Sequence, residues 1–159
     1  MRVLAIDPGY ERVGIAVLEK QHQKEICIHS ECFTTLQETS FNNRLFEIGT
    51  HIRDVIKKYS IDALAIEGLF FSKNTKTALQ VSEARGVIIF QASDSNIPIF
   101  EYTPNQIKVA VTGYGKASKK DMQNMVYKLI SLKDKKRKDD EIDAIAIGIT
   151  FFAIQKTFN

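Results

Sequence analysis

The chain has 159 residues, of which 44% are hydrophobic and 26% charged, and it carries a formal net charge of +3. This length suits one domain with a core of its own, and the composition excludes a disordered or fibrous protein. No apolar run approaches the roughly 20 residues needed to cross a bilayer, and the N-terminus lacks the apolar stretch and cleavage site of a signal peptide. We therefore expect a single cytoplasmic domain over residues 1–159.

The first part of the chain has the pattern of a small antiparallel sheet. The apolar run 3–6 is broken by the Asp-Pro-Gly segment 7–9 and resumes over 13–18, which predicts a hairpin. A third strand over about 25–33 would complete a meander. Apolar residues then recur mostly at spacings of three and four, which predicts a helix that begins near Ser40.

The rest of the chain alternates strands and helices. Residues 63–66 are uniformly apolar, which suits a parallel strand covered on both faces. A helix over about 75–93 and a strand over 97–102, with Pro98 near its start, complete a β-α-β unit. Three further helices are predicted, over about 103–111, from 118 onward and over about 139–154. These elements indicate an α/β fold with a mixed five-stranded sheet, three antiparallel strands and then two parallel ones, flanked by helices.

Four carboxylates stand beside apolar segments. Asp7 and Glu67 each end an apolar strand, where a carboxylate is costly to desolvate without a partner. Asp140 and Asp143, three residues apart in the last helix, project from one face. If the first strand lies beside the strand 63–66, all four acids converge and raise one another's pKa values unless a cation neutralises them. Clustered hard oxygens suit Mg²⁺ or Mn²⁺, so the pattern predicts a metal site. The alternative is that each acid is an isolated cap, turn or surface residue.

Cysteine, histidine and glycine motifs offer weaker competing sites. Cys27 and Cys32 lie near His22 and His29, but their spacing fits no common zinc pattern. Regular strand alternation would put Cys27 and His29 on one side and Cys32 on the other. No histidine lies beside an evident nucleophile motif, and the glycine spacing before Lys116 is wrong for a P-loop.

Several segments resemble the motifs of the RuvC family of Holliday junction resolvases, in the same order and at similar separations. They are Ile6-Asp7-Pro8-Gly9, Ala65-Ile66-Glu67, Lys73-Asn74, Ala84-Arg85-Gly86-Val87 and Asp140-Glu141-Ile142-Asp143-Ala144. The similarity covers nearly the whole chain, and the stretch from Glu67 through Gly86 and the Phe100-Glu101-Tyr102 segment make it specific. The resemblance implies an RNase H-like fold and a homodimer that binds a four-way DNA junction and nicks two strands of like polarity symmetrically. It also suggests a RuvAB-type branch migration complex as a partner.

The resemblance further implies which residues carry the chemistry. Asp7, Glu67, Asp140 and Asp143 would be the catalytic, metal-binding acids, and phosphodiester hydrolysis would leave a 5′-phosphate and a 3′-hydroxyl. Two Mg²⁺ ions, for which Mn²⁺ would substitute, would lie about 4 Å apart, one activating the attacking water and the other stabilising the leaving 3′ oxygen.

The residues expected to contact DNA are Phe70, Lys73, Lys108, Lys116, Lys119 and Lys120. Phe70 matches a family aromatic that contacts bases near the cut, where unpaired bases offer a face for stacking. Lys108 and Lys119 match family lysines near the scissile phosphate or the DNA backbone. The plainer alternatives are a buried phenylalanine and ordinary solvated helix surface.

Three other functions are consistent with parts of the pattern. Another RNase H-like nuclease would use the same metals but prefer RNA or a hybrid substrate, and a non-catalytic junction-binding protein would show no metal-dependent cleavage. An actin-like ATPase would share the Asp-Pro-Gly segment, but the chain is too short for two such lobes. The segment Ser131 to Lys138 is more basic than expected for the family, and its role is open.

Overall fold

A computed structural model describes the chain apart from residues 23, 69–74, 131, 133–136 and 156–159. The strands are β1 (Arg2–Asp7), β2 (Arg12–Gln21), β3 (Lys24–Thr34), β4 (Ala63–Glu67) and β5 (Ile99–Tyr102). The helices are α1 (Phe41–Tyr59), α2 (Thr75–Asp94), α3 (Pro104–Thr112), α4 (Lys119–Leu129) and α5 (Asp139–Ile154). Each element predicted from the residue pattern is present, and the described residues contain no helix long and apolar enough to span a membrane.

The strands form one mixed sheet in the order β3-β2-β1-β4-β5. β1 to β3 pair antiparallel, whereas β4 pairs parallel with both β1 and β5. This confirms the predicted arrangement of three antiparallel strands followed by two parallel ones. β1 is the central strand, and its parallel partner β4 brings the ends of the two strands to the same edge of the sheet.

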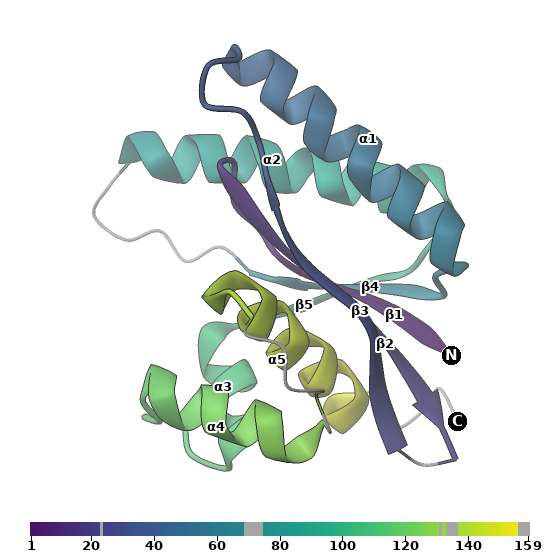
Figure 1. Cartoon of the computed structure of the whole chain (residues 1–159), viewed down its shortest axis with the longest axis vertical. Coiled ribbons are helices and arrows are strands. Elements are labelled where there is room, and N and C mark those ends of the chain that lie inside the picture. Colours follow the sequence, from purple (N-terminus) through teal and green to yellow (C-terminus); the bar gives the residue numbers. More distant parts are fainter. Residues whose placement is uncertain (23, 69–74, 131, 133–136, 156–159) are drawn as a thin grey trace.

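Helices cover both faces of the sheet, with α1 and α2 on one side and α3, α4 and α5 on the other (Figure 1). Successive side chains of a strand point to opposite faces, so β1 contributes to two cores. Leu4 and Ile6 pack in the core under α1 and α2, while Val3 and Ala5 pack in the core under α5. Burial on both faces explains why the sequence of β1 is uniformly apolar rather than alternating.

β3 departs from the regular alternation expected for its cysteines. His29 and Cys27 pair with consecutive residues of β2, which leaves Ile28 as the extra residue of a β-bulge. Because the bulge shifts the alternation by one residue, Cys27 lies on the α5 side of the sheet with Cys32, and His29 lies on the α1 side. The expectation that Cys27 and His29 share a side is therefore wrong.

The start of β5 also differs from the expected one. The strand begins at Ile99 rather than Ile97, because Pro98 has no N–H to give to a ladder. The carbonyl of Pro98 still accepts a hydrogen bond from the backbone of Leu64, at 2.9 Å. Pro98 therefore marks the entry to the strand.

Candidate active site

The first two acids come together because β1 and β4 are parallel and in register. Ile6 pairs with Ile66, so Asp7 and Glu67 are the next residues of two adjacent strands at the same edge. Both side chains emerge where the fully buried part of each strand ends. The proximity inferred from the apolar pattern is therefore produced by the parallel pairing of the two strands.

The first turn of helix α5 can approach this edge because β2 has a glycine, Gly14, at the point of contact. Gly14 of β2 pairs with Asp7, and a Cβ at Gly14 would lie 2.1 Å from the backbone oxygen of Asp140. Only a residue without a side chain lets the first turn of α5 approach β2 so closely. This contact sets the position of Asp140 and Asp143 relative to the sheet edge.

Three of the four acids line one cavity of about 240 Å³ between the sheet edge and the helices α3, α4 and α5. Its lining consists of Asp7, Glu67, Pro104, Ile107, Lys108, Lys119, Met122, Asp143, Ala146 and Ile147. The lining thus combines three carboxylates and two lysines with apolar side chains. A largely apolar wall strengthens the electrostatic interactions of the charged groups beside it.

The acids of the cavity disfavour one another's ionisation. Burial, followed by the charges of Glu67, Asp143 and Asp140, raises the pKa of Asp7 to about 7. Burial and then the charge of Asp143 raise the pKa of Glu67, and burial raises that of Asp143 against the opposing effect of Lys119. Such a set of crowded oxygens is stabilised by a cation, and its hard donors suit a divalent ion of the Mg²⁺ type.

Asp140 stands beside the cavity rather than in its lining. Its Oδ2 accepts a hydrogen bond from the Cys32 thiol at 3.6 Å and lies 3.8 Å from Arg12 Nε. Its charge nevertheless reaches Asp7, whose pKa it helps to raise. In the described part of the chain, no three His, Cys, Asp or Glu side chains already stand together as a metal-ligand group. The carboxylates would therefore have to draw closer around a bound ion.

Lys119 links the start of α4 to the start of α5. Its Nζ lies 3.1 Å from Asp139 Oδ2 and 3.4 Å from Asp143 Oδ2. Burial would lower the pKa of Lys119, but the hydrogen bond to Asp139 and the charge of Asp143 outweigh it, so the pKa is raised. A permanent positive charge thus stands among the acids and partly neutralises them.

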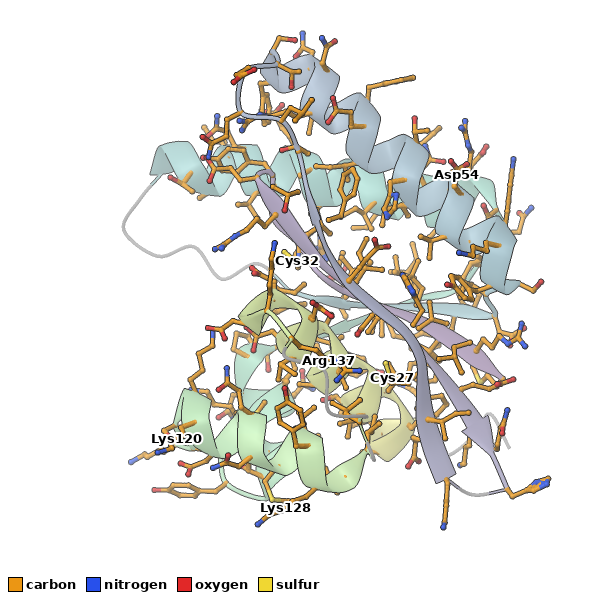
Figure 2. The ribbon with its side chains drawn as sticks, in the orientation of Figure 1. Cys27, Cys32, Asp54, Lys120, Lys128 and Arg137 are labelled. Atoms are coloured by element: carbon orange, nitrogen blue, oxygen red, sulfur yellow. The ribbon has the colours of Figure 1, made fainter. Side chains whose placement is uncertain are left out.

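The other residues expected to contact DNA are distributed unevenly. Lys108 lines the cavity with Lys119, whereas Lys116 and Lys120 are exposed outside it. Figure 2 shows Lys120 projecting from α4 away from the rest of the molecule. Phe70 and Lys73 lie outside the described residues. The structure therefore brings two of the predicted lysines to the acids.

The basic segment before α5 is described only in part. Lys133, Lys135 and Lys136 lie outside the described residues. Arg137 is described: its Nε donates a hydrogen bond to Ser30 Oγ of β3 at 3.2 Å. Arg137 and Cys27 are labelled in Figure 2, near the place where β3 meets α5. At least one of the basic residues therefore contributes to the packing of α5 on the sheet.

Sequence reasoning did not identify several residues that shape the site. Asp139 forms an ion pair with Lys119. Asp140 is approached by Arg12 and by Cys32. Glu141 is buried, with only 6% of its surface exposed. Two further acids beside the two candidate ligands were a visible signal for Asp139 and Glu141. Nothing in the local pattern distinguishes Arg12 or Cys32, because their contacts come from elements far apart in the chain.

The histidines on the other face of β3 form a separate group. His29 Nε2 and His51 Nε2 each hydrogen bond to the same oxygen, Glu31 Oε1, at 3.0 and 2.8 Å. The ring of His29 stacks on Tyr59 and that of His51 on Phe33. These contacts join β3 to α1, on the side of the sheet away from the cavity.

Comparison with known proteins gives one consistent result. The family model described as "Crossover junction endodeoxyribonuclease RuvC" matches residues 3–151. The chain is 46% identical over 148 residues to the protein of that name from Thermosipho melanesiensis, covering 93% of this chain and 94% of the relative. It is 44% identical over 149 residues to the protein of that name from Halothermothrix orenii, covering 94% and 90%.

A solved structure agrees with these matches. Thermus thermophilus RuvC in complex with Holliday junction substrate superposes with a TM-score of 0.88 at 30% identity, covering 94% of this chain and 92% of that one. The predicted RNase H-like fold is confirmed by this likeness.

Proposed function

Because this chain belongs to the RuvC family of crossover junction endodeoxyribonucleases, we propose that it resolves four-way Holliday junctions during DNA recombination and repair. It is an endonuclease, and its whole length, residues 1–159, would act as one nuclease domain. The observation that carries the proposal is the single cavity that Asp7, Glu67 and Asp143 line together with Lys108 and Lys119. Crowded carboxylates and cations together suit the metal-assisted hydrolysis of a phosphodiester.

The four acids would hold the metal. Members of this family are metal-dependent nucleases. In this chain Asp7, Glu67 and Asp143 would bind from the cavity and Asp140 from beside it, and two Mg²⁺ ions, or Mn²⁺ in their place, suit this number of oxygen donors. When bound, the ions supply positive charge to the attacking and leaving oxygens of the phosphodiester. Hydrolysis would leave a 5′-phosphate and a 3′-hydroxyl.

The lysines of the chain would bind and orient the DNA backbone. Lys108 and Lys119 line the same cavity as the acids, so their ammonium groups would stand next to a phosphate held there. Lys116 and Lys120 are exposed on the neighbouring surface and would contact phosphates farther along the strand. Phe70 and Lys73 would contact DNA from the segment between β4 and α2, as the family resemblance implies.

The substrate and its symmetry suggest the partners. The Thermus thermophilus relative is described in complex with a Holliday junction substrate, and we propose four-way junction DNA for this chain. Symmetric nicking of two strands needs two active sites, which a homodimer supplies. Leu79 and Phe90 support a partner along α2, since each is 62% exposed and they lie about three turns apart on that helix. A RuvAB-type branch migration complex would be a further partner.

Cleavage of synthetic substrates tests the function. The purified protein should nick a four-way junction symmetrically in Mg²⁺, and a chelator should abolish the reaction. Glu67→Gln and Asp7→Asn should also abolish it, because each removes an anionic oxygen donor with little change in shape. Glu25→Gln, the same type of change at the far end of β3, is the matched control and should cleave like the unmodified chain.

Substrate controls separate this function from the alternatives. Linear duplex and single-stranded DNA should be cut poorly in the same buffer. Cleavage of an RNA–DNA hybrid in preference to the junction would favour an RNA-directed nuclease. Junction binding without any metal-dependent cleavage would indicate a non-catalytic junction-binding protein and refute the proposal.

A further inference from the structure

We propose that Glu141 is a positioning residue that ties the first turn of α5 to β3 and thereby holds Asp140 and Asp143 in place at the cavity. The inference rests on the proposed function, because it assigns Glu141 a task in building that same site. Glu141 is not among the residues that line the cavity, so it would act through the backbone of the turn that carries Asp140 and Asp143.

Glu141 is a buried carboxylate with specific partners. Only 6% of its surface is exposed. Its Oε2 accepts a hydrogen bond from Ser30 Oγ at 3.0 Å, and its Oε1 accepts one from the backbone N–H of Lys138 at 3.3 Å. Ser30 in turn accepts from Arg137 Nε at 3.2 Å. A buried carboxylate is costly unless it is hydrogen-bonded, so this chain of contacts holds the side chain in one place.

Glu141 supplies capping to α5 that the side chain of its N-cap residue does not. The N-cap residues of α1, α3 and α4 are Ser40, Thr103 and Ser118, whose hydroxyls accept from backbone N–H groups of the first turn. The N-cap residue of α5 is Lys138, whose side chain makes no such bond, and the capping contact there is the one in which Glu141 accepts from the Lys138 backbone N–H. A first turn without an N-cap hydroxyl frays more readily, and this turn also carries the like charges of the candidate site. The contacts of Glu141 restrain it.

The direction of Glu141 fits an anchor rather than a ligand. Residues of an α-helix follow one another at about 100°, so Glu141 points about 160° away from Asp143. One side of the turn therefore faces the cavity and the other faces β3. Ser30 and Cys32, two residues apart on the same face of β3, contact Glu141 and Asp140 respectively. The strand thus holds two consecutive residues of α5.

Metal dependence is the readout that separates positioning from simple packing. A residue that only stabilises the fold changes the melting temperature and leaves the Mg²⁺ requirement of the folded enzyme unaltered. Loss of a group that orients metal ligands weakens metal binding, commonly by about 10–100-fold. The half-saturating Mg²⁺ concentration for junction cleavage should therefore rise about tenfold or more in Glu141→Ala and rise in Ser30→Ala. Junction affinity measured without divalent metal should stay the same in both variants.

Two further variants sharpen the test. Glu141→Gln should stay close to the unmodified enzyme, since its carbonyl can accept from Lys138 and its amide can donate to the Ser30 hydroxyl, which also accepts. Glu25→Ala removes a carboxylate from the far end of β3 and should leave the Mg²⁺ dependence unchanged. If Glu141→Ala does not fold, the Mg²⁺ requirement of Ser30→Ala tests the proposal instead, because that variant removes one hydroxyl and keeps the Glu141 carboxylate.

The outcomes are distinct. A rise in the Mg²⁺ requirement for Ser30→Ala, with Glu141→Gln and Glu25→Ala near the unmodified value, supports positioning. An unchanged Mg²⁺ requirement in folded Ser30→Ala and Glu141→Ala overturns it. If the unmodified chain itself fails to cleave junctions in Mg²⁺, the proposed function fails instead, and that result is recognised before any variant is compared.

Discussion

Replacing Gly14 with alanine adds a methyl group where β2 contacts the first turn of α5 and leaves every charge of the site in place. The added Cβ would stand 2.1 Å from the backbone oxygen of Asp140, 2.8 Å from its carbonyl carbon and 3.1 Å from the Cβ of Asp7. Real Cβ atoms essentially never lie closer than 3.0 Å to such atoms. The obstructing atoms belong mainly to backbone, which cannot rotate away as a flexible side chain can.

The size of the effect follows from that overlap. The first turn of α5 must move by about 1 Å, and a misplacement of this size in a catalytic group can lower the rate about a hundredfold. Crowding a packed interior by one methyl group costs about 1–3 kcal/mol of folding free energy. We therefore expect Gly14→Ala to lose about a hundredfold in cleavage rate while it remains folded near room temperature.

Single-turnover cleavage of a four-way junction at saturating Mg²⁺ measures this effect, with thermal unfolding measured in parallel. The matched control is Gly148→Ala on the same helix, where the new Cβ would meet the flexible side chain of Leu18, at 2.6 Å from Cδ1. It should lower the melting temperature yet cleave at nearly the unmodified rate. A Gly14→Ala variant that cleaves as fast as this control would refute the idea that the glycine contact places the acids.

Three other predictions concern charge. The pKa of Asp7, raised to about 7 by burial and then by neighbouring acids, means that the folded metal-free protein holds a proton which the unfolded chain has released. The stability contribution of Asp7 therefore falls as the pH rises from about 4 to about 7. Because Mg²⁺ competes with that proton, it should raise the melting temperature more at pH 8 than at pH 6. Equal shifts in melting temperature at the two pH values would contradict this. Lys119→Ala should reduce the slope of log junction affinity against log salt concentration by about 1, and an unchanged slope would exclude a phosphate contact. Burial would raise the pKa of Glu31, but hydrogen bonds from His29 and His51 outweigh it and hold the pKa below 4.5. The ionised Glu31 carboxylate therefore stabilises the fold above that pH, and this stabilisation is lost as the pH falls below it. The melting temperature of Glu31→Gln should lie below that of the unmodified chain at pH 7 and converge with it in acid. A difference in melting temperature that stays constant with pH would contradict this.

The elements and the candidate acids are readable from the sequence because local burial leaves a periodic trace. The uniformly apolar runs 3–6 and 63–66 reflect strands buried on both faces, and the spacing of three and four along α1 reflects one buried helical face. An acid directly after such a run stands out because its burial is costly, which is why Asp7 and Glu67 could be identified without any coordinates.

Tertiary structure alone decided how these parts meet. The bulge at Ile28 reverses the face of Cys27, Asp140 stands beside the cavity with Arg12, and Glu141 turns inward to Ser30. Each of these outcomes depends on the register and separation of elements that lie far apart in the chain. Periodicity records which face of an element is buried, but it carries no information about which residue of a distant element that face will meet.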